Sequence, residues 1–116
     1  MPTRQYSAVR RPDGTVLVTW SGLLNGDDGA SYEAPPLADR ALQVSGVFGA
    51  GGTLVLEGTI DGVNWAVLND PQGNALTITS SRIEQIMELV VSVRPRVSSG
   101  DGNTSLVVSM LLKETR

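Results

Sequence analysis

The chain has 116 residues, 41% of them apolar, and a net charge of −3, which fits one globular domain with one hydrophobic core. It contains no cysteine and no histidine, and its one lysine is Lys113. These absences exclude disulfides, thiolate metal sites and catalytic sites of the Ser-His-Asp or Cys-His kind. The sequence therefore predicts a protein that is not an enzyme and that uses no cofactor.

The acidic balance argues against binding to nucleic acid or to an anionic membrane. No apolar run approaches the length of a membrane span, and residues 1–11 lack the apolar segment of an export signal. We therefore expect no nucleic-acid partner and no membrane partner, and a protein made without an export signal.

The first third of the chain lacks a regular pattern apart from one strand. Residues 1–12 show neither helical nor strand periodicity and are predicted to form an extended N-terminal arm. Residues 13–116 are predicted to form the single domain, in which 15–20 is a strand and 21–40 is one long loop that contains Pro35-Pro36.

The middle of the chain alternates apolar and polar residues between turn signals. Residues 42–48 and 54–60 alternate on either side of a glycine-rich turn, which predicts a hairpin. A short strand at 64–68 and a further strand at 76–79 follow. Residues 80–88 break the alternation, and Ser81 with Glu84 fits a capping box, which predicts one helical turn that crosses between two sheets.

The last part of the chain predicts a second hairpin, formed by 89–97 and 106–112 around a turn at 98–103. Pro95 lies inside the first of these strands and predicts a sheet edge or a bulge, because proline cannot donate to a ladder. Turn signals recur about every eight to twelve residues, as in sandwiches and barrels. The predicted fold is therefore all-β, an antiparallel β-sandwich that is jelly-roll-like.

Two loops carry patterns that chemistry could use. Residues 25–29, NGDDG, offer oxygen ligands for Ca²⁺ but lack the spacing of a known calcium loop, so we interpret them as a plain loop without metal. Asp61, Asn64 and Trp65 could form a sugar-contact edge with the indole as a stacking platform. The favoured interpretation is a turn at Asp61-Gly62 with Trp65 filling one end of the core.

The remaining candidates are residues for binding a partner. Arg94 and Arg96 flank Pro95 and either meet partner carboxylates or protect an edge strand from pairing. The predicted arm and long loop carry basic, aromatic and apolar side chains that a neighbouring subunit could bury. The predicted partner-binding residues are Arg4, Tyr6, Arg10, Arg11, Tyr32, Leu37, Arg94 and Arg96. Apolar residues at nominally exposed positions, Val90, Val107 and Leu111, predict self-association.

Residues 57–65, EGTIDGVNW, are followed by Leu68, Asp70 and Gly73. Together they resemble small virion β-proteins of tailed bacteriophages, and the similarity extends over roughly residues 41–112. The resemblance implies a capsid cement (decoration) protein, often a homotrimer, that binds across subunits of the major capsid protein. It would be made in the host cytoplasm and reside on the capsid surface of the virion.

Two other functions are compatible with the same residues. The Asp-Gly-x-x-Trp hairpin also occurs in sugar-binding sandwiches, which makes a carbohydrate-binding module on a phage surface or tail the alternative. A tail or head-completion component is the third possibility.

Overall fold

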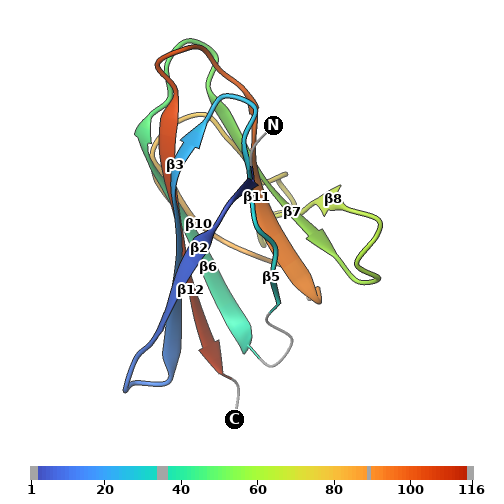
Figure 1. The fold of residues 1–116 in the computed structure, drawn as a ribbon. Coiled ribbons are helices and arrows are strands. Elements are labelled where there is room, and N and C mark those ends of the chain that lie inside the picture. The colour runs from blue at the N-terminus through green and yellow to red at the C-terminus, as the bar shows by residue number, and fades with distance from the viewer. Residues whose placement is uncertain (1–2, 34–36, 89, 115–116) are drawn as a thin grey trace.

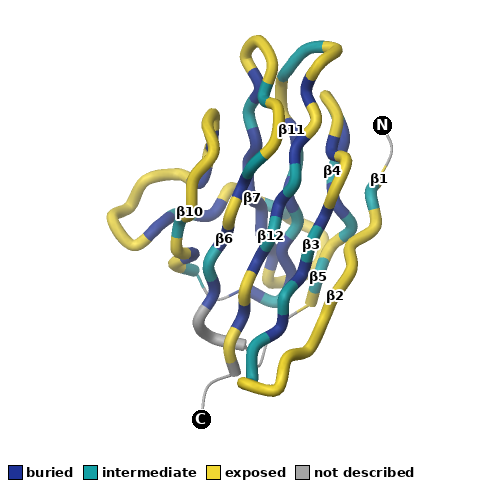
Figure 2. The backbone as a smooth tube through the Cα atoms, turned by 90° about the vertical axis from the view of Figure 1, so that its left-hand side faces the viewer, coloured by how far each residue is buried: buried dark blue, intermediate teal, exposed yellow. Residues whose placement is uncertain are grey.

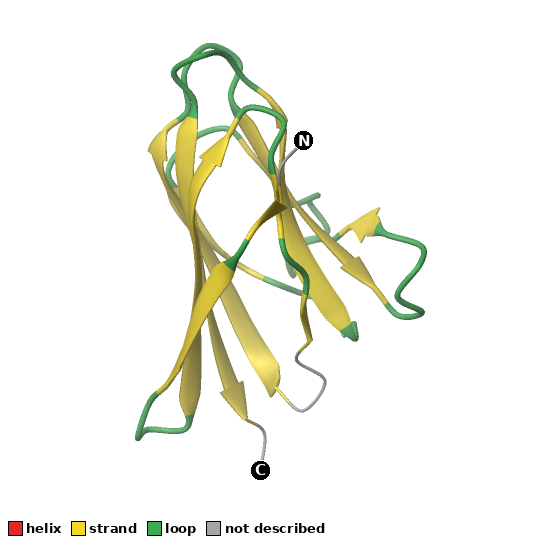
Figure 3. Cartoon of the chain, in the orientation of Figure 1, coloured by secondary structure: helices red, strands yellow, loops and turns green. Residues whose placement is uncertain are grey.

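The computed structural model describes residues 3–33, 37–88 and 90–114, and for 37–39 and 114 it describes the backbone alone. The strands in chain order are β1 (Thr3–Arg4), β2 (Tyr6–Arg10), β3 (Thr15–Leu24), β4 (Asp28–Gly29), β5 (Tyr32–Glu33), β6 (Leu37–Val47), β7 (Thr53–Thr59), β8 (Ala66–Val67), β9 (Thr77–Ile78), β10 (Arg82–Gln85), β11 (Ser92–Ser99) and β12 (Ser105–Glu114). The described residues contain no helix, as Figure 3 shows, and so none that could cross a membrane.

The strands form two sheets that pack face to face (Figure 1). The seven-stranded sheet has the order β1-β4-β11-β7-β8, with β5 also paired to β11 and β9 to β7. The five-stranded sheet has the order β10-β6-β12-β3-β2. All pairs are antiparallel except β1 with β4. The predicted antiparallel β-sandwich is therefore confirmed.

The core lies between the sheets, because each long strand turns alternate side chains inward. Trp20 is fully buried there, and its indole Nε1 donates a hydrogen bond to the Ala30 carbonyl at 2.9 Å. Most other core residues are Val and Leu, and burying each stabilises the fold by about 1.5–3 kcal/mol. The neighbouring interior strands β3 and β12 supply Val16, Val18, Leu106, Val108, Met110 and Leu112.

Both predicted hairpins are wrong in their pairing. β6 and β7 lie in different sheets, and so do β11 and β12. The turns after β6 and β11 instead cross the sandwich at the same end, where the two loops lie together at the top of Figure 1. Ala50 N donates to Asp101 Oδ2 at 2.9 Å, and Thr104 Oγ1 donates to the Phe48 carbonyl at 2.7 Å. Alternation predicted which face each strand buries, but not which strand it pairs with.

The predicted arm and the predicted long loop both contain strands. β2 pairs with β3 along its whole length, while β1 pairs with β4, so residues 3–10 reach both sheets. Within 21–40, β3 continues to Leu24, β4 and β5 pair with the same side of β11, and β6 begins at Leu37. Pro35-Pro36 lies outside the described residues. Most of these strands are short or lie at a sheet border. Neither face of such a strand needs to be uniformly apolar, so their sequences show no alternation of apolar and polar residues.

The predicted helical turn at 80–88 is also wrong. Residues Arg82–Gln85 form β10, an edge strand paired with β6. Ile86 alone joins the core, whereas Ile83 and Met87 are exposed, so the helical spacing of these three residues did not mark one buried face.

Pro95 lies in the interior of the seven-stranded sheet and not at its edge. On one side β7 pairs along the strand, and on the other side the partner is interrupted between β4 and β5. A Cβ placed on Gly29 would lie 2.7 Å from the Pro95 ring, so the glycine permits strands β4 and β11 to approach closely there.

Candidate functional site

Arg4, predicted to bind a partner, is bound to its own chain. Its Nε lies 2.8 Å from Asp27 Oδ2, and the same carboxylate oxygen accepts the Leu24 N–H at 2.9 Å. Burial alone would raise the pKa of Asp27, but these two hydrogen bonds outweigh it and hold the pKa below its usual value. The predicted plain loop at 25–29 thus contains a buried carboxylate that ties β1 to the end of β3.

Tyr6 and Tyr32 form an aromatic cluster with Trp20. The Tyr6 ring meets Trp20 edge to face at 5.9 Å between centroids, and it meets Tyr32 in the same manner at 5.2 Å. The two predicted binding tyrosines therefore close one side of the sandwich over the core tryptophan.

Arg94 and Arg96 both bind Glu57 on the neighbouring strand. The distances are 3.0 Å from Arg94 Nε to Glu57 Oε1 and 2.9 Å from Arg96 Nη2 to Glu57 Oε2. The Arg94 guanidinium also lies over the Trp65 ring, 4.1 Å from its centroid. The role in protecting an edge strand does not apply, because β11 is an interior strand. Binding to partner carboxylates stays a prediction, and here the two arginines form an ion-pair cluster with Glu57.

Trp65 does not belong to the core, so the favoured interpretation of that residue is wrong. It is half-buried and lies outside the cluster of core residues, in which Trp20 is the tryptophan. Val90, predicted to be exposed, is buried in the core, while Val107 is half-buried and Leu111 is exposed.

The other predicted binding residues lie at or near the five-stranded sheet. Arg10 is exposed on β2, Arg11 follows it, and the Leu37 side chain lies outside the described residues. The predicted set is therefore not one site, since it is divided between the two sheets and mostly bound within the chain.

A continuous apolar surface crosses the outer face of the five-stranded sheet. Cross-strand pairing places Val9 beside Leu17, Leu17 beside Leu111, and Leu111 beside Ala41. Ile83 on β10 lies diagonally next to Ala41, because it pairs with Gln43. Figure 2 shows these five strands side by side, from β10 to β2. We call Val9, Leu17, Ala41, Ile83 and Leu111 the apolar row.

The apolar row is open to solvent although its members are cross-strand neighbours over all five strands. Val9, Ile83 and Leu111 are 55%, 65% and 41% exposed. Two shallow hollows of about 380 and 280 Å³ lie along the row, and their linings include the charged residues Arg11, Arg40 and Lys113. The adjoining pairs Ser7–Thr19 and Ser109–Gln43 add a neutral polar row. Such an apolar centre with a polar border is typical of a protein-binding surface.

Of the apolar row, Leu111 was singled out from the sequence as an exposed apolar residue, and Val9 as an apolar side chain of the predicted arm. Leu17 carried the same signal, because it stands between Val16 and Val18 at a position that alternation assigns to solvent. Ala41 carried no signal, and Ile83 was interpreted as part of a helical turn, since these residues join the row only through the strand register.

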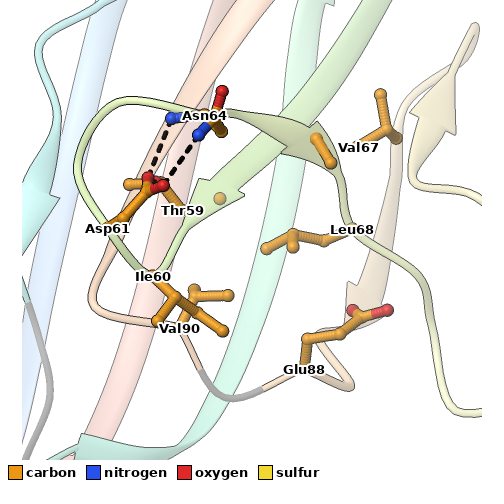
Figure 4. Close-up of a pocket in the computed structure, with 10 residues that line it drawn as sticks. Thr59, Ile60, Asp61, Asn64, Val67, Leu68, Glu88 and Val90 are labelled. Carbon is orange, nitrogen blue, oxygen red and sulfur yellow. Dashed lines mark hydrogen bonds between the residues drawn. The ribbon is translucent and has the colours of Figure 1, made fainter.

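A third hollow, of about 440 Å³, is lined by the β7–β8 hairpin and by Glu88 and Val90 (Figure 4). Asp61 accepts hydrogen bonds from the N–H groups of Val63 and Asn64, both at 2.8 Å, and from the Asn64 amide at 2.7 Å. These bonds hold the pKa of Asp61 well below its usual range. Glu88 likewise accepts both Asn69 N and Nδ2, at 2.8 and 2.6 Å.

The carboxylates of this hollow are thus engaged within the chain, and much of the remaining lining is apolar, including Ile60, Val67 and Val90. Trp65 is also covered on one ring face by Arg94. The hollow therefore offers few open polar groups for a sugar. Among the described residues, no group of three or more Asp or Glu side chains is placed to hold a metal ion.

No family model matches the chain, and no curated protein matches it in sequence. Among solved structures it is similar to the SPBc2 prophage-derived protein YomS, with a TM-score of 0.63, 8% identity, and coverage of 84% of this chain and 93% of YomS. At this identity the likeness establishes a shared fold, the β-sandwich of a prophage-derived protein.

Two further similarities are weaker. A Neisseria meningitidis protein gives a TM-score of 0.42 at 16% identity, covering 99% of this chain and 87% of the other. An RmlC-like cupin protein from Desulfovibrio desulfuricans gives 0.43 at 8% identity, covering 93% and 82%. Scores this low support no argument about function.

Proposed function

We propose that the protein is a virion structural protein, a capsid decoration protein that binds subunits of the major capsid protein through the outer face of its five-stranded sheet. Two features support a phage origin: the resemblance of residues 57–65 to small virion β-proteins, and the fold likeness to a prophage-derived protein. The observation that carries the proposal is the apolar row.

The apolar row suits a docking surface because it is wide and because its residues lie on a continuous hydrogen-bonded sheet. Five adjacent strands span about 19 Å at the usual spacing between strands. The row stands on a continuous sheet, whose ladders β6–β12 and β12–β3 hold its centre. A surface built on paired strands loses little conformational entropy on binding. Many copies on a symmetric particle would also add avidity to contacts that are individually modest.

Binding to assembled heads tests the proposal. The probe is the set of empty heads formed by the major capsid protein of the same genome, and co-sedimentation measures occupancy. Leu111→Asp should weaken binding by at least about tenfold, or about 1.4 kcal/mol, because it places a charge in the centre of the row. Leu111 is exposed, so the fold should survive, and circular dichroism checks this.

Val63→Asp is the matched control. Val63 is an exposed apolar residue on the β7–β8 hairpin, which belongs to the other sheet. This variant should bind heads like the wild type. Wild-type protein that fails to co-sediment would overturn the proposed function, and equal binding by Leu111→Asp would remove the apolar row from it.

A further inference from the structure

The outer face of the five-stranded sheet extends along the strands beyond the apolar row. Ser105 and Leu111 lie on the same face of β12, because side chains alternate along a strand and the residues between them are buried at every second position. Cross-strand pairing places Leu24 on one side of Ser105 and Val47 on the other. Leu24 and Val47 are 44% and 56% exposed. The outer face therefore carries a second exposed apolar strip, formed by Leu24 and Val47, where β12 begins.

The opposite end of the same face is bordered by cations. Lys113 is the next outward residue of β12 after Leu111, and it is exposed. Arg11, which directly follows β2, is exposed too. One hollow of the apolar row is lined by Arg11 and the other by Lys113 and Arg40, while no described Asp or Glu lines either of them. The charged residues of the hollows are thus all cations, in a chain whose net charge is −3. We call Arg11 and Lys113 the cationic end.

Two acidic residues lie close to the cationic end in the fold. Asp13, in the turn after β2, accepts hydrogen bonds from Thr15 N and Thr15 Oγ1 at 3.1 and 2.6 Å, so its carboxylate is held within that turn. Asp39 pairs with Lys113 in the register of β6 and β12, and its side chain lies outside the described residues. The experiment below therefore includes a variant of Asp39.

Given the proposed function, on which this step rests, we propose that the docking surface of the major capsid protein is apolar and carries carboxylates at one end, where they meet Arg11 and Lys113. Charge complementarity carries this assignment, because interfaces place opposite charges against each other. At the other end, Leu24 and Val47 require an apolar surface of the partner, because a charge buried against them would lose its water without gaining an ion pair.

The size of the outer face explains why its charges should matter. From Ser105 to Lys113, β12 runs about 27 Å, and the five strands are about 19 Å wide. Such a footprint, roughly 500 Å², is smaller than the roughly 800 Å² that each partner buries in a standard interface. Apolar burial alone then gives a weak contact, to which ionic attraction adds a faster encounter and a fixed orientation. Because the cations stand at one end only, the protein should dock in one direction along its strands.

Charge reversal at Lys113 tests the acidic partner surface. Lys113→Glu should bind empty heads at least about tenfold more weakly than the wild type at low salt, and the difference should shrink as sodium chloride is raised to about 0.5 M. Lys113 is exposed, so the fold should survive, and circular dichroism checks this. Lys113→Arg keeps the charge and should bind like the wild type. Arg82→Glu is the matched control: it changes the net charge equally, but Arg82 adjoins Ile83 on β10 and so lies on the other face.

A second variant changes the charge in the opposite direction. Asp39→Asn removes the acidic residue across from Lys113, so it should strengthen binding to an acidic surface by about two- to fivefold at low salt. Wild-type protein that fails to co-sediment with heads would overturn the proposed function. Wild-type binding that Lys113→Glu leaves unchanged, or that Asp39→Asn weakens, would overturn the acidic partner surface alone and leave the proposed function intact.

Discussion

At the scale of single residues, several charged side chains of this chain are bound to each other in ion pairs. Glu57 is buried, and it holds both Arg94 and Arg96 on the neighbouring strand. Burial alone would raise the pKa of Glu57, but the hydrogen bonds and charges of the two arginines outweigh it and lower the pKa below 4.5. The ionised form of Glu57 therefore stabilises the folded state.

This stabilisation should depend on pH. Because the folded-state pKa is depressed, the contribution is complete above the unfolded-state pKa and is lost as the pH falls through the folded-state value. Glu57→Gln should lower the free energy of unfolding by about 2 kcal/mol at neutral pH, between the values for exposed and buried ion pairs. Urea titrations of both proteins should show the difference shrinking as the pH falls below 4.5.

Glu84→Gln serves as the comparison for that experiment. Glu84 pairs with Arg82 on the exposed border strand, so its loss should cost under about 1 kcal/mol. Equal losses at Glu57 and Glu84 would contradict a special role for the buried cluster.

The two tryptophans should differ strongly in their contribution to stability. Trp20 is fully buried and donates to the Ala30 carbonyl, so Trp20→Ala should cost about 3–5 kcal/mol and leave that carbonyl unpaired. Trp65 is half-buried and stacks on Arg94, so Trp65→Ala should cost less than half as much. Chemical denaturation monitored by circular dichroism measures both, and a larger loss at Trp65 would contradict this assignment of the core.

At the scale of elements, the sequence predicted strands well and their partners poorly. The stretches 15–20 and 106–112 lie in strands, and 42–48 and 54–60 do so except for their last residues, because each alternates long enough to bury one full face. Their pairing depends on contacts between distant residues, and alternation alone carries no information about those. A glycine-rich turn fits a hairpin and a crossing between sheets equally well, and here both such turns cross.

The candidate site illustrates the same limit. Arg4, Arg94 and Arg96 were singled out for their charge, yet their carboxylate partners stand 23 to 39 residues away in the chain. Conversely, the apolar row is assembled from single residues of five strands, and only the register brings them together. The sequence indicated that arginines and exposed apolar residues would make contacts. The fold was needed to show which residues they lie beside.

At the scale of the whole molecule, the N-terminal residues join the two sheets. β2 pairs with β3 in the five-stranded sheet, and β1 pairs with β4 in the seven-stranded one. In β2, Tyr6 packs against Trp20, and in β1, Arg4 neutralises the buried Asp27. Residues 1–12 were predicted to form an extended arm outside the single domain, and an arm of that kind would add little to stability. The structure predicts the opposite for stability.

Deletion of residues 1–12 should therefore destabilise the isolated domain. It removes the border strand and leaves Asp27 charged and buried without its cation, which by itself costs about 3–5 kcal/mol in a fully buried pair. Arg4 is partly exposed, so the lower end applies to that term, and the lost β2 packing adds to it. With about 4–8 °C per kcal/mol for a small domain, the melting temperature should fall by at least about 10 °C in calorimetry.

A double substitution separates the ion pair from the strand. Arg4→Met keeps β1 and β2 but removes the cation, so it should reproduce much of the loss. Adding Asp27→Asn to Arg4→Met should recover part of it, because a neutral amide is less costly to bury than an unpaired carboxylate. A truncated chain that melts within a few degrees of the wild type would show instead that residues 1–12 form a dispensable arm, with β1 and β2 adding nothing to the sandwich.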